Sequence, residues 1–198
     1  MSKSKGLWTP ANIVTCARVV LVPVWLLLAE FVGVSRGSSV SWPGMCVFAG
    51  FVLVSLTDKL DGYLARSRNE VTTFGKFLDP IADKLAVVVA LCFLLEHQMT
   101  SSWVLLVVVA REFLVSGLRM VVASKGVVVA ASNLGKWKTA TTMVAICGLL
   151  FVCALPADMA FAGYLEVVCQ VCMAAAVVLT AWSGIDYFVK SWRYLSED

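Results

Sequence analysis

Six apolar runs, separated by short polar or glycine- and proline-containing breaks, occupy most of this 198-residue chain. Most of the runs reach or approach the length of about 20 residues that an α-helix needs to cross a bilayer. The pattern predicts an all-α, polytopic membrane protein with six transmembrane helices, folded as a single membrane domain over residues 1–198. The predicted spans are residues 12–34, 42–65, 76–96, 102–123, 138–156 and 160–189. Residues 1–11, with Trp8 and Pro10, form either an interfacial segment or a frayed terminus.

Composition supports the membrane interpretation and excludes other classes. The chain is 60% hydrophobic and 15% charged, whereas soluble domains are about half apolar and about a quarter charged. Its net charge of +3 comes without a cluster of Lys and Arg interleaved with aromatics, which argues against nucleic-acid binding. The seven cysteines are scattered mostly through apolar runs, where a free thiol behaves as a small hydrophobe, so we expect no disulfide framework.

The basic residues predict the orientation of the chain in the membrane. If the N-terminus is cytoplasmic, the outer segments hold only Arg36, and the inner segments and adjoining helix ends hold eleven basic residues. These are Lys3, Lys5, Arg66, Arg68, Lys76, Arg119, Lys125, Lys136, Lys138, Lys190 and Arg193. By the positive-inside rule, both termini are expected in the cytoplasm, with the protein in a cell inner or plasma membrane.

Four aspartates lie close together in this apolar sequence. Asp58 and Asp61 are three residues apart, and Asp79 and Asp83 are four apart, so each pair shares one face of a helix. A short connection between the two helices lets them run antiparallel, and the four carboxylates then converge near the cytoplasmic side. Oxygen ligands without His or Cys suit Mg²⁺ or Mn²⁺, and four carboxylates suffice for two ions. Salt bridges to nearby Lys and Arg residues are the structural alternative.

Small residues accompany these aspartates. Gly62, Ala65 and Gly75 leave room for a ligand or a facing backbone to approach closely. Together with Arg66 they complete the pattern D-x-x-D-G-x-x-A-R-x8-G-x3-D-x3-D, which resembles the signature of the CDP-alcohol phosphotransferase family at every position.

The resemblance implies a six-helix membrane enzyme, often a homodimer, that transfers a substituted phosphate from a CDP-linked donor to an alcohol and releases CMP. It implies that two Mg²⁺ or Mn²⁺ ions are held on the cytoplasmic side by Asp58, Asp61, Asp79 and Asp83. Asp83 is also the expected general base. The residues expected to bind CDP or CMP are Asp58, Gly62, Ala65, Arg66 and Gly75.

Three further stretches resemble the phosphatidylglycerophosphate synthases of that family. They are Asn12-x-x-Thr15-x-x-Arg18-x4-Pro23, Ala110-Arg111-Glu112 with Arg119, and Gly135-Lys136-x-Lys138-Thr139. This resemblance implies CDP-diacylglycerol as the donor and sn-glycerol 3-phosphate as the acceptor, with membrane lipids around the protein. The residues expected to bind the acceptor phosphate are Arg111, Arg119, Lys138, Thr15 and Arg18.

Several alternatives stay open at this point. Arg119 and Lys138 can also serve membrane topology or contact anionic lipids. Arg111 lies deeper, about 12 Å of helix from Arg119, and needs a partner at that depth, either Glu112 or the substrate phosphate. The acceptor can instead be an inositol phosphate, or phosphatidylglycerol as in a cardiolipin synthase. A cation transporter that uses the four aspartates is the alternative from another functional class.

Overall fold

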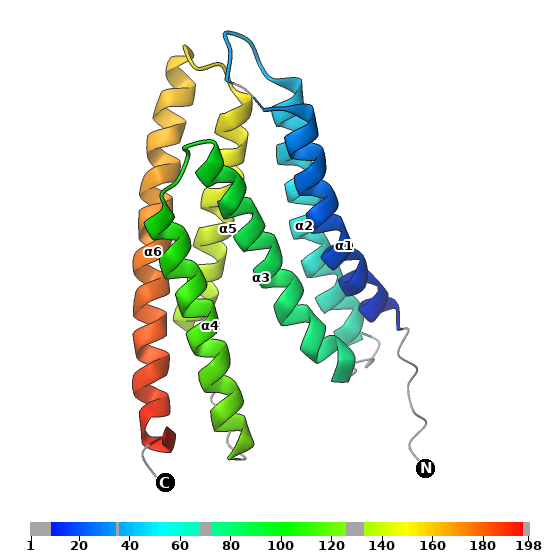
Figure 1. The fold of residues 1–198 in the computed structure, drawn as a ribbon, viewed down its shortest axis with the longest axis vertical. Coiled ribbons are helices and arrows are strands. Elements are labelled where there is room, and N and C mark those ends of the chain that lie inside the picture. The colour runs from blue at the N-terminus through cyan, green and yellow to red at the C-terminus, as the bar shows by residue number, and fades with distance from the viewer. Residues whose placement is uncertain (1–8, 35, 68–72, 126–132, 196–198) are drawn as a thin grey trace. The chain divides into compact units, whose positions relative to one another are not determined.

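The computed structural model describes residues 9–34, 36–67, 73–125 and 133–195, in which all regular secondary structure is α-helical (Figure 1). The helices of these residues are α1 (Pro10–Val32), α2 (Trp42–Ser67), α3 (Thr73–Glu96), α4 (Ser102–Ser124), α5 (Asn133–Ala154) and α6 (Ala160–Leu195). Each of the six predicted spans coincides with one helix, which confirms the all-α class.

The helix ends differ from the predicted spans where polar residues extend a helix. Helix α5 begins at Asn133, although its predicted span begins at residue 138, and α6 continues to Leu195 beyond residue 189. The predicted spans counted apolar residues, but backbone hydrogen bonding continues through polar ones. Helix α1 has clear local signals: the Thr9 hydroxyl caps the amide of Asn12 at 3.3 Å, Pro10 opens the helix, and Gly33 closes it at φ +65°.

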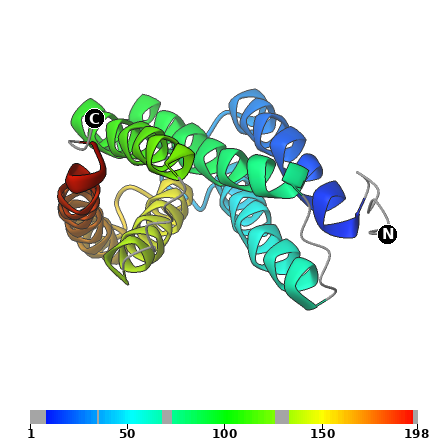
Figure 2. The ribbon, with the colours of Figure 1, turned by 90° about the horizontal axis from the view of Figure 1, so that it is seen from below.

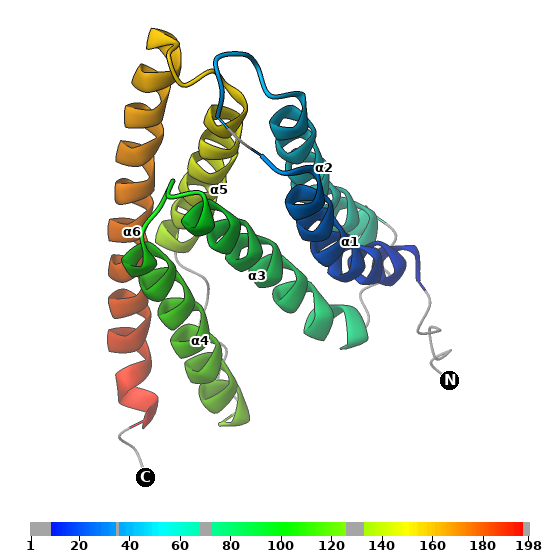
Figure 3. The ribbon, with the colours of Figure 1, turned by 45° about the horizontal axis from the view of Figure 1, so that its top comes forward.

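One compact unit of the chain comprises Met1–Phe93 and Leu150–Ala162. In it α1 packs beside α2, as Figure 1 and Figure 3 show. Trp25 is at the centre of this packing, with its ring centroid 5.4 Å from Phe51 and 5.6 Å from Phe93. Its indole nitrogen donates to the Val47 carbonyl at 2.8 Å, so the ring is buried without an unsatisfied donor.

The start of α2 lies close to the end of α5 within the same unit. A Cβ at Gly44 would lie 2.8 Å from the Ala154 Cα, so only glycine permits this approach. The amide of Ser41 donates to the Ala154 carbonyl at 2.9 Å, and the amide of Ala157 donates to the Gly37 carbonyl at 3.0 Å. These bonds tie Ser41 to the end of α5 and Gly37 to the connection that follows α5.

The other compact unit comprises Leu94–Leu149 and Gly163–Asp198. Here α5 and α6 lie side by side (Figure 2), and a Cβ at Gly148 would collide with the Cys169 sulfur. The Gln170 amide donates to the Met99 carbonyl at 2.7 Å, which ties α6 to the segment before α4. Small residues and polar groups therefore join these helices, as is usual where lipid provides no hydrophobic drive for association.

The distribution of side chains is that of a membrane protein. Phe31 is 90% exposed, whereas Arg18 is 1% and Thr180 is 0% exposed, so large apolar side chains are exposed while some polar ones are buried beside the apolar core. Within the described residues, three segments are long and apolar enough to cross a membrane, namely Asn12–Val32, Leu134–Ala154 and Ala160–Trp192. Helix α2 adds a shorter apolar stretch, Trp42–Thr57, and ionisable residues interrupt the apolar runs of α3 and α4.

Candidate active site

The aspartate motif occupies the end of α2 and the beginning of α3. Asp58 and Asp61 belong to α2, and Asp79 and Asp83 belong to α3, so both pairs have the helical spacing that the sequence predicts. The side chains of Asp58, Asp61 and Asp79 lie outside the described residues, and so do those predicted to bind the nucleotide, namely Gly62, Ala65, Arg66 and Gly75. The convergence of the four carboxylates stays a prediction.

Asp83 forms an ion pair with α1. The Nη1 of Arg18 donates to its Oδ1 at 2.6 Å, and the side chains are 2% and 50% exposed respectively. The buried guanidinium is thereby neutralised, while half of the Asp83 side chain stays accessible. Arg18 therefore orients the predicted general base, in addition to the contact with acceptor phosphate that the sequence predicts for it.

Arg18 belongs to a buried stripe along α1. Asn12, Thr15 and Arg18 recur every three residues and are 1–2% exposed, and Val22 and Trp25 continue the same face with apolar side chains. The buried face of α1 is thus polar in its first half and apolar in its second. The polar half includes both residues of α1 that the sequence predicts for the acceptor site, Thr15 and Arg18.

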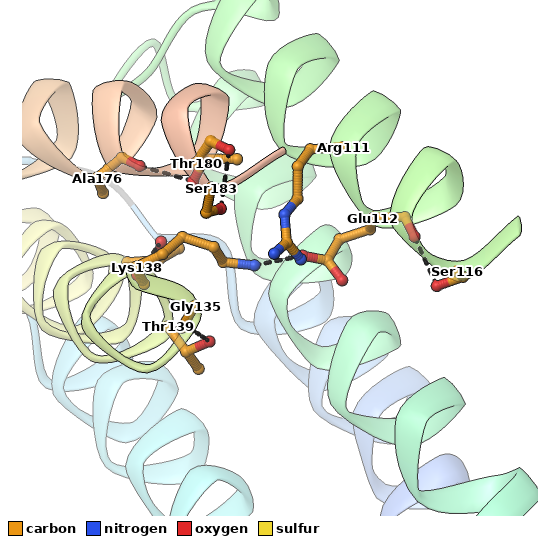
Figure 4. Close-up of polar contacts among 10 residues, drawn as sticks. Arg111, Glu112, Ser116, Gly135, Lys138, Thr139, Ala176, Thr180 and Ser183 are labelled. Atoms are coloured by element: carbon orange, nitrogen blue, oxygen red, sulfur yellow. Dashed lines mark hydrogen bonds and ion pairs between the residues drawn. The ribbon is translucent and has the colours of Figure 1, made fainter. Parts of the chain in front are cut away.

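A second ionic cluster lies in the other unit, on α4 and α5. Both Arg111 and Lys138 donate to the same oxygen, Oε1 of Glu112, with the Arg111 Nη1 at 3.1 Å (Figure 4). The three side chains are only 10–16% exposed. Two predicted acceptor-site cations are therefore brought together by a carboxylate, and the three side chains together carry one net positive charge.

Glycines make space for the Arg111 side chain. A Cβ at Gly184 of α6 would lie 3.1 Å from the Arg111 Cγ, and one at Gly135 of α5 would lie 3.9 Å from its Nη2. The Nε of Arg111 is buried and has no hydrogen-bond acceptor among the described residues. The guanidinium is thus anchored at Nη1, enclosed along its stem, and has a donor left at Nε.

Arg119 of α4 lies against an aromatic side chain of α6. Its guanidinium carbon lies 6.0 Å from the centroid of the Tyr187 ring on α6. The hydroxyls of Tyr187 and Ser191, one turn apart, are buried without a hydrogen-bond partner in the part of the chain that is described. The structure therefore brings Arg111 and Lys138 to one carboxylate and Arg119 to an aromatic face.

Comparison with known proteins assigns the chain to a family. Residues 8–182 match the sequence model of the CDP-alcohol phosphatidyltransferases. The chain belongs to this family. The match includes both compact units, and it confirms the resemblance that the motif from Asp58 to Asp83 indicates.

Curated CDP-alcohol phosphatidyltransferases are similar to the chain over nearly its whole length. The CDP-diacylglycerol–glycerol-3-phosphate 3-phosphatidyltransferase of Bacillus subtilis (strain 168) is 41% identical over 190 residues, covering 93% of this chain and 95% of the relative. The enzyme of the same name from Rickettsia felis is 38% identical, with 92% and 95% coverage. A probable phosphatidylglycerophosphate synthase of Mycobacterium tuberculosis (strain H37Rv) is 40% identical, with 92% and 81% coverage.

CDP-alcohol phosphatidyltransferases are generally metal-dependent, and the donor groups of this chain fit a divalent ion. All four motif residues are carboxylates, the donor type that Mg²⁺ and Mn²⁺ prefer. Asp83 pairs with Arg18 and is still half exposed, so the ion pair does not enclose it. Among the side chains that the structure describes, which exclude those of Asp58, Asp61 and Asp79, no group of three His, Cys, Asp or Glu could hold a metal ion.

Some residues around the predicted site residues of this phosphatidyltransferase could not be predicted from the sequence. The sequence predicts Glu112 only as one possible partner of Arg111. Its second bond, to Lys138, depends on the packing of α5 against α4. Gly184 in the last span has no sequence signal that separates it from other small residues of membrane helices. Tyr187 and Ser191 were likewise not predicted, because nothing local marks a buried hydroxyl without a partner.

Proposed function

We propose that the chain transfers the phosphatidyl group of CDP-diacylglycerol to sn-glycerol 3-phosphate, which yields phosphatidylglycerophosphate and CMP. The observation that carries this proposal is the 41% identity to the Bacillus subtilis enzyme named for this reaction, over 93% of the chain. The partly buried Arg111 and Lys138 support it, because an acceptor that bears a phosphate dianion needs cations.

The donor site is proposed at the junction of α2 and α3. Gly62, Ala65, Arg66 and Gly75 would line the CMP position, and Asp58, Asp61, Asp79 and Asp83 would hold two Mg²⁺ or Mn²⁺ ions. Such ions, when bound, neutralise the pyrophosphate and stabilise charge on the departing CMP. The helical spacing of the two aspartate pairs supports this assignment.

Asp83 is proposed to act as the general base. The acceptor hydroxyl oxygen forms a bond to the phosphorus that carries the diacylglycerol, the bond from that phosphorus to the CMP oxygen breaks, and the hydroxyl proton moves to the Asp83 carboxylate. Arg18 supports this role because its donation to Oδ1 at 2.6 Å fixes the carboxylate while half of the side chain stays exposed.

The acceptor phosphate is proposed to bind through Arg111, Arg119 and Lys138, with Thr15 and Arg18 contributing from α1. The Glu112 cluster retains one net positive charge, and Arg111 retains a buried donor at Nε, so both charge and hydrogen bonding favour an anion there. Lys138 is only 8% exposed, and a lysine that served only to orient the chain in the membrane would not need to be buried.

We further propose one membrane domain with six spans and cytoplasmic termini, working as a homodimer in a cell inner or plasma membrane with its site facing the cytoplasm. The predominance of Lys and Arg in the segments assigned to the inside supports this orientation. The family match from residue 8 to residue 182 supports a single domain.

The test is CMP release by the detergent-purified protein from CDP-diacylglycerol, with glycerol 3-phosphate, inositol phosphate, serine and phosphatidylglycerol supplied separately, with and without EDTA. EDTA-sensitive release with glycerol 3-phosphate alone is expected. Release with a different acceptor would retain the reaction class and overturn the acceptor. Absence of CMP with every acceptor, together with metal uptake by vesicles that contain the protein, would favour the transporter.

A further inference from the structure

The carboxylate of Glu112 is shared by two basic side chains. One oxygen of its carboxylate, Oε1, accepts from Arg111 of the same helix and also from Lys138 of α5, which lies 26 residues further along the chain (Figure 4). Two cations whose side chains are only 16% and 10% exposed repel each other strongly, because solvent screens partly buried charges poorly. The carboxylate between them is what allows both to stay side by side.

One edge of the Arg111 guanidinium carries a donor that has no partner among the residues that the structure describes. Nη1 is held by Glu112, while the stem lies against Gly184, where any Cβ would come within 3.1 Å of Cγ. A further donor, the N–H at Nε, is buried and has no acceptor in the described residues. Because a buried donor without a partner is costly, this edge is poised to bind an oxygen from a ligand.

The charge balance defines the kind of ligand. Arg111 and Lys138 contribute two positive charges and Glu112 contributes one negative charge, so the cluster is left with an excess of one. A planar guanidinium edge beside an ammonium group matches the tetrahedral oxygens of a phosphate monoester. A neutral polyol would satisfy the Nε donor but would not pair with either positive charge.

We infer that Glu112 is a positioning residue for the acceptor phosphate: it holds Arg111 and Lys138 together so that the Arg111 Nε edge and the Lys138 ammonium bind phosphate oxygens. This inference rests on the proposed function. It differs from a competing role, in which the carboxylate occupies the phosphate position and must be displaced before the acceptor binds.

The experiment compares Glu112→Gln and Glu112→Asp with the unmodified protein. Glutamine keeps the shape but loses the charge, and aspartate keeps the charge but is one methylene shorter. Asp186→Asn is the matched control, because it removes a carboxylate of the same unit that pairs with Lys190 at 2.7 Å on the exposed part of α6. Binding of inorganic phosphate and of glycerol 3-phosphate is measured by calorimetry in uncharged detergent, and the KM values of donor and acceptor are measured by CMP release.

For Glu112→Gln we expect phosphate binding about tenfold weaker and acceptor KM about tenfold higher. The glutamine oxygen can still accept hydrogen bonds, but without the negative charge nothing offsets the repulsion between Arg111 and Lys138, and the two cations move apart. The donor KM and kcat should change little. Glu112→Asp should recover part of the loss, and Asp186→Asn should behave as the unmodified protein. If Glu112→Gln does not fold, Glu112→Asp alone still tests the inference, since its acceptor KM should rise while its donor KM does not.

Unchanged or tighter phosphate binding in Glu112→Gln would overturn the inference and support the competing role. An equal rise in both KM values would also overturn it, because it would indicate a general structural effect. If phosphate binding weakens as expected but the unmodified protein releases no CMP with glycerol 3-phosphate, the anion site stands and the proposed acceptor fails.

Discussion

Two ion clusters with opposite organisation occupy the two compact units. On α1 and α3, the cation Arg18 is buried and the anion Asp83 is half exposed, whereas on α4 and α5 the anion Glu112 lies between Arg111 and Lys138 and the excess charge is positive. The first cluster offers a carboxylate to whatever binds there, and the second offers cations. An ion pair with a half-exposed carboxylate therefore suits a metal ion or a proton, whereas a cluster with excess positive charge suits an anion.

The contrast predicts that changes in the aspartate motif affect turnover and that changes on α4 affect acceptor binding. Asp79→Asn is expected to have the largest effect, with CMP release below detection, because the change removes one of the four carboxylates proposed to hold the two metal ions. Release is measured across a range of Mg²⁺ and Mn²⁺ concentrations, with Asp186→Asn as the control. Near-normal turnover in Asp79→Asn would contradict the two-metal assignment.

Asp83→Asn should lower kcat by about 10²- to 10⁴-fold, the usual contribution of a general base, because the amide cannot accept the proton. The asparagine oxygen can still accept from Arg18 but no longer neutralises its buried guanidinium, so the thermal unfolding temperature should also fall. The measurement is kcat and both KM values, alongside an unfolding curve in the same detergent. A loss that appears only as a higher acceptor KM would remove the proton-transfer role from Asp83.

Arg119→Ala should raise the acceptor KM by about tenfold, with a smaller effect on the donor KM, because a charge-assisted hydrogen bond to phosphate is lost. Trp137→Ala is a matched control, since this side chain is exposed on α5 next to Lys138. Steady-state kinetics with each substrate varied separately would check the expectation. An unchanged acceptor KM would return Arg119 to a role in topology or lipid contact.

Gly184→Ala should have the smallest effect, an acceptor KM raised by about two- to fivefold, because the new Cβ meets the Arg111 stem at 3.1 Å and shifts it without removing a charge. Gly163→Ala on the same helix is the control, because nothing lies within 4 Å of its added Cβ. Steady-state kinetics with each substrate varied separately measure the acceptor KM of both variants. An equal response of both variants would show that Arg111 tolerates the shift.

The helices were largely predictable from the sequence because their causes are local. Apolar runs of membrane length predict six helices, and each helix of the described residues lies where a run lies. The extra turns of α5 and α6 were not predicted, because hydropathy reports where lipid begins and ends rather than where backbone hydrogen bonding stops. The spacing of Asp58, Asp61, Asp79 and Asp83 could likewise be interpreted from local helix geometry alone.

The partners of the site residues could not be derived in the same way. Arg18 and Asp83 are 65 residues apart, and Glu112 and Lys138 are 26 residues apart, so only the packing of one helix on another makes them neighbours. The room that Gly184 leaves for Arg111 depends on α6 lying against α4.

By itself, the sequence determined the helical class, the membrane character and the reaction family, because hydropathy and motif spacing are properties of short segments. The tertiary structure decided which charges neutralise each other and which donors remain available, because an ion pair depends on distances between helices that no local pattern contains.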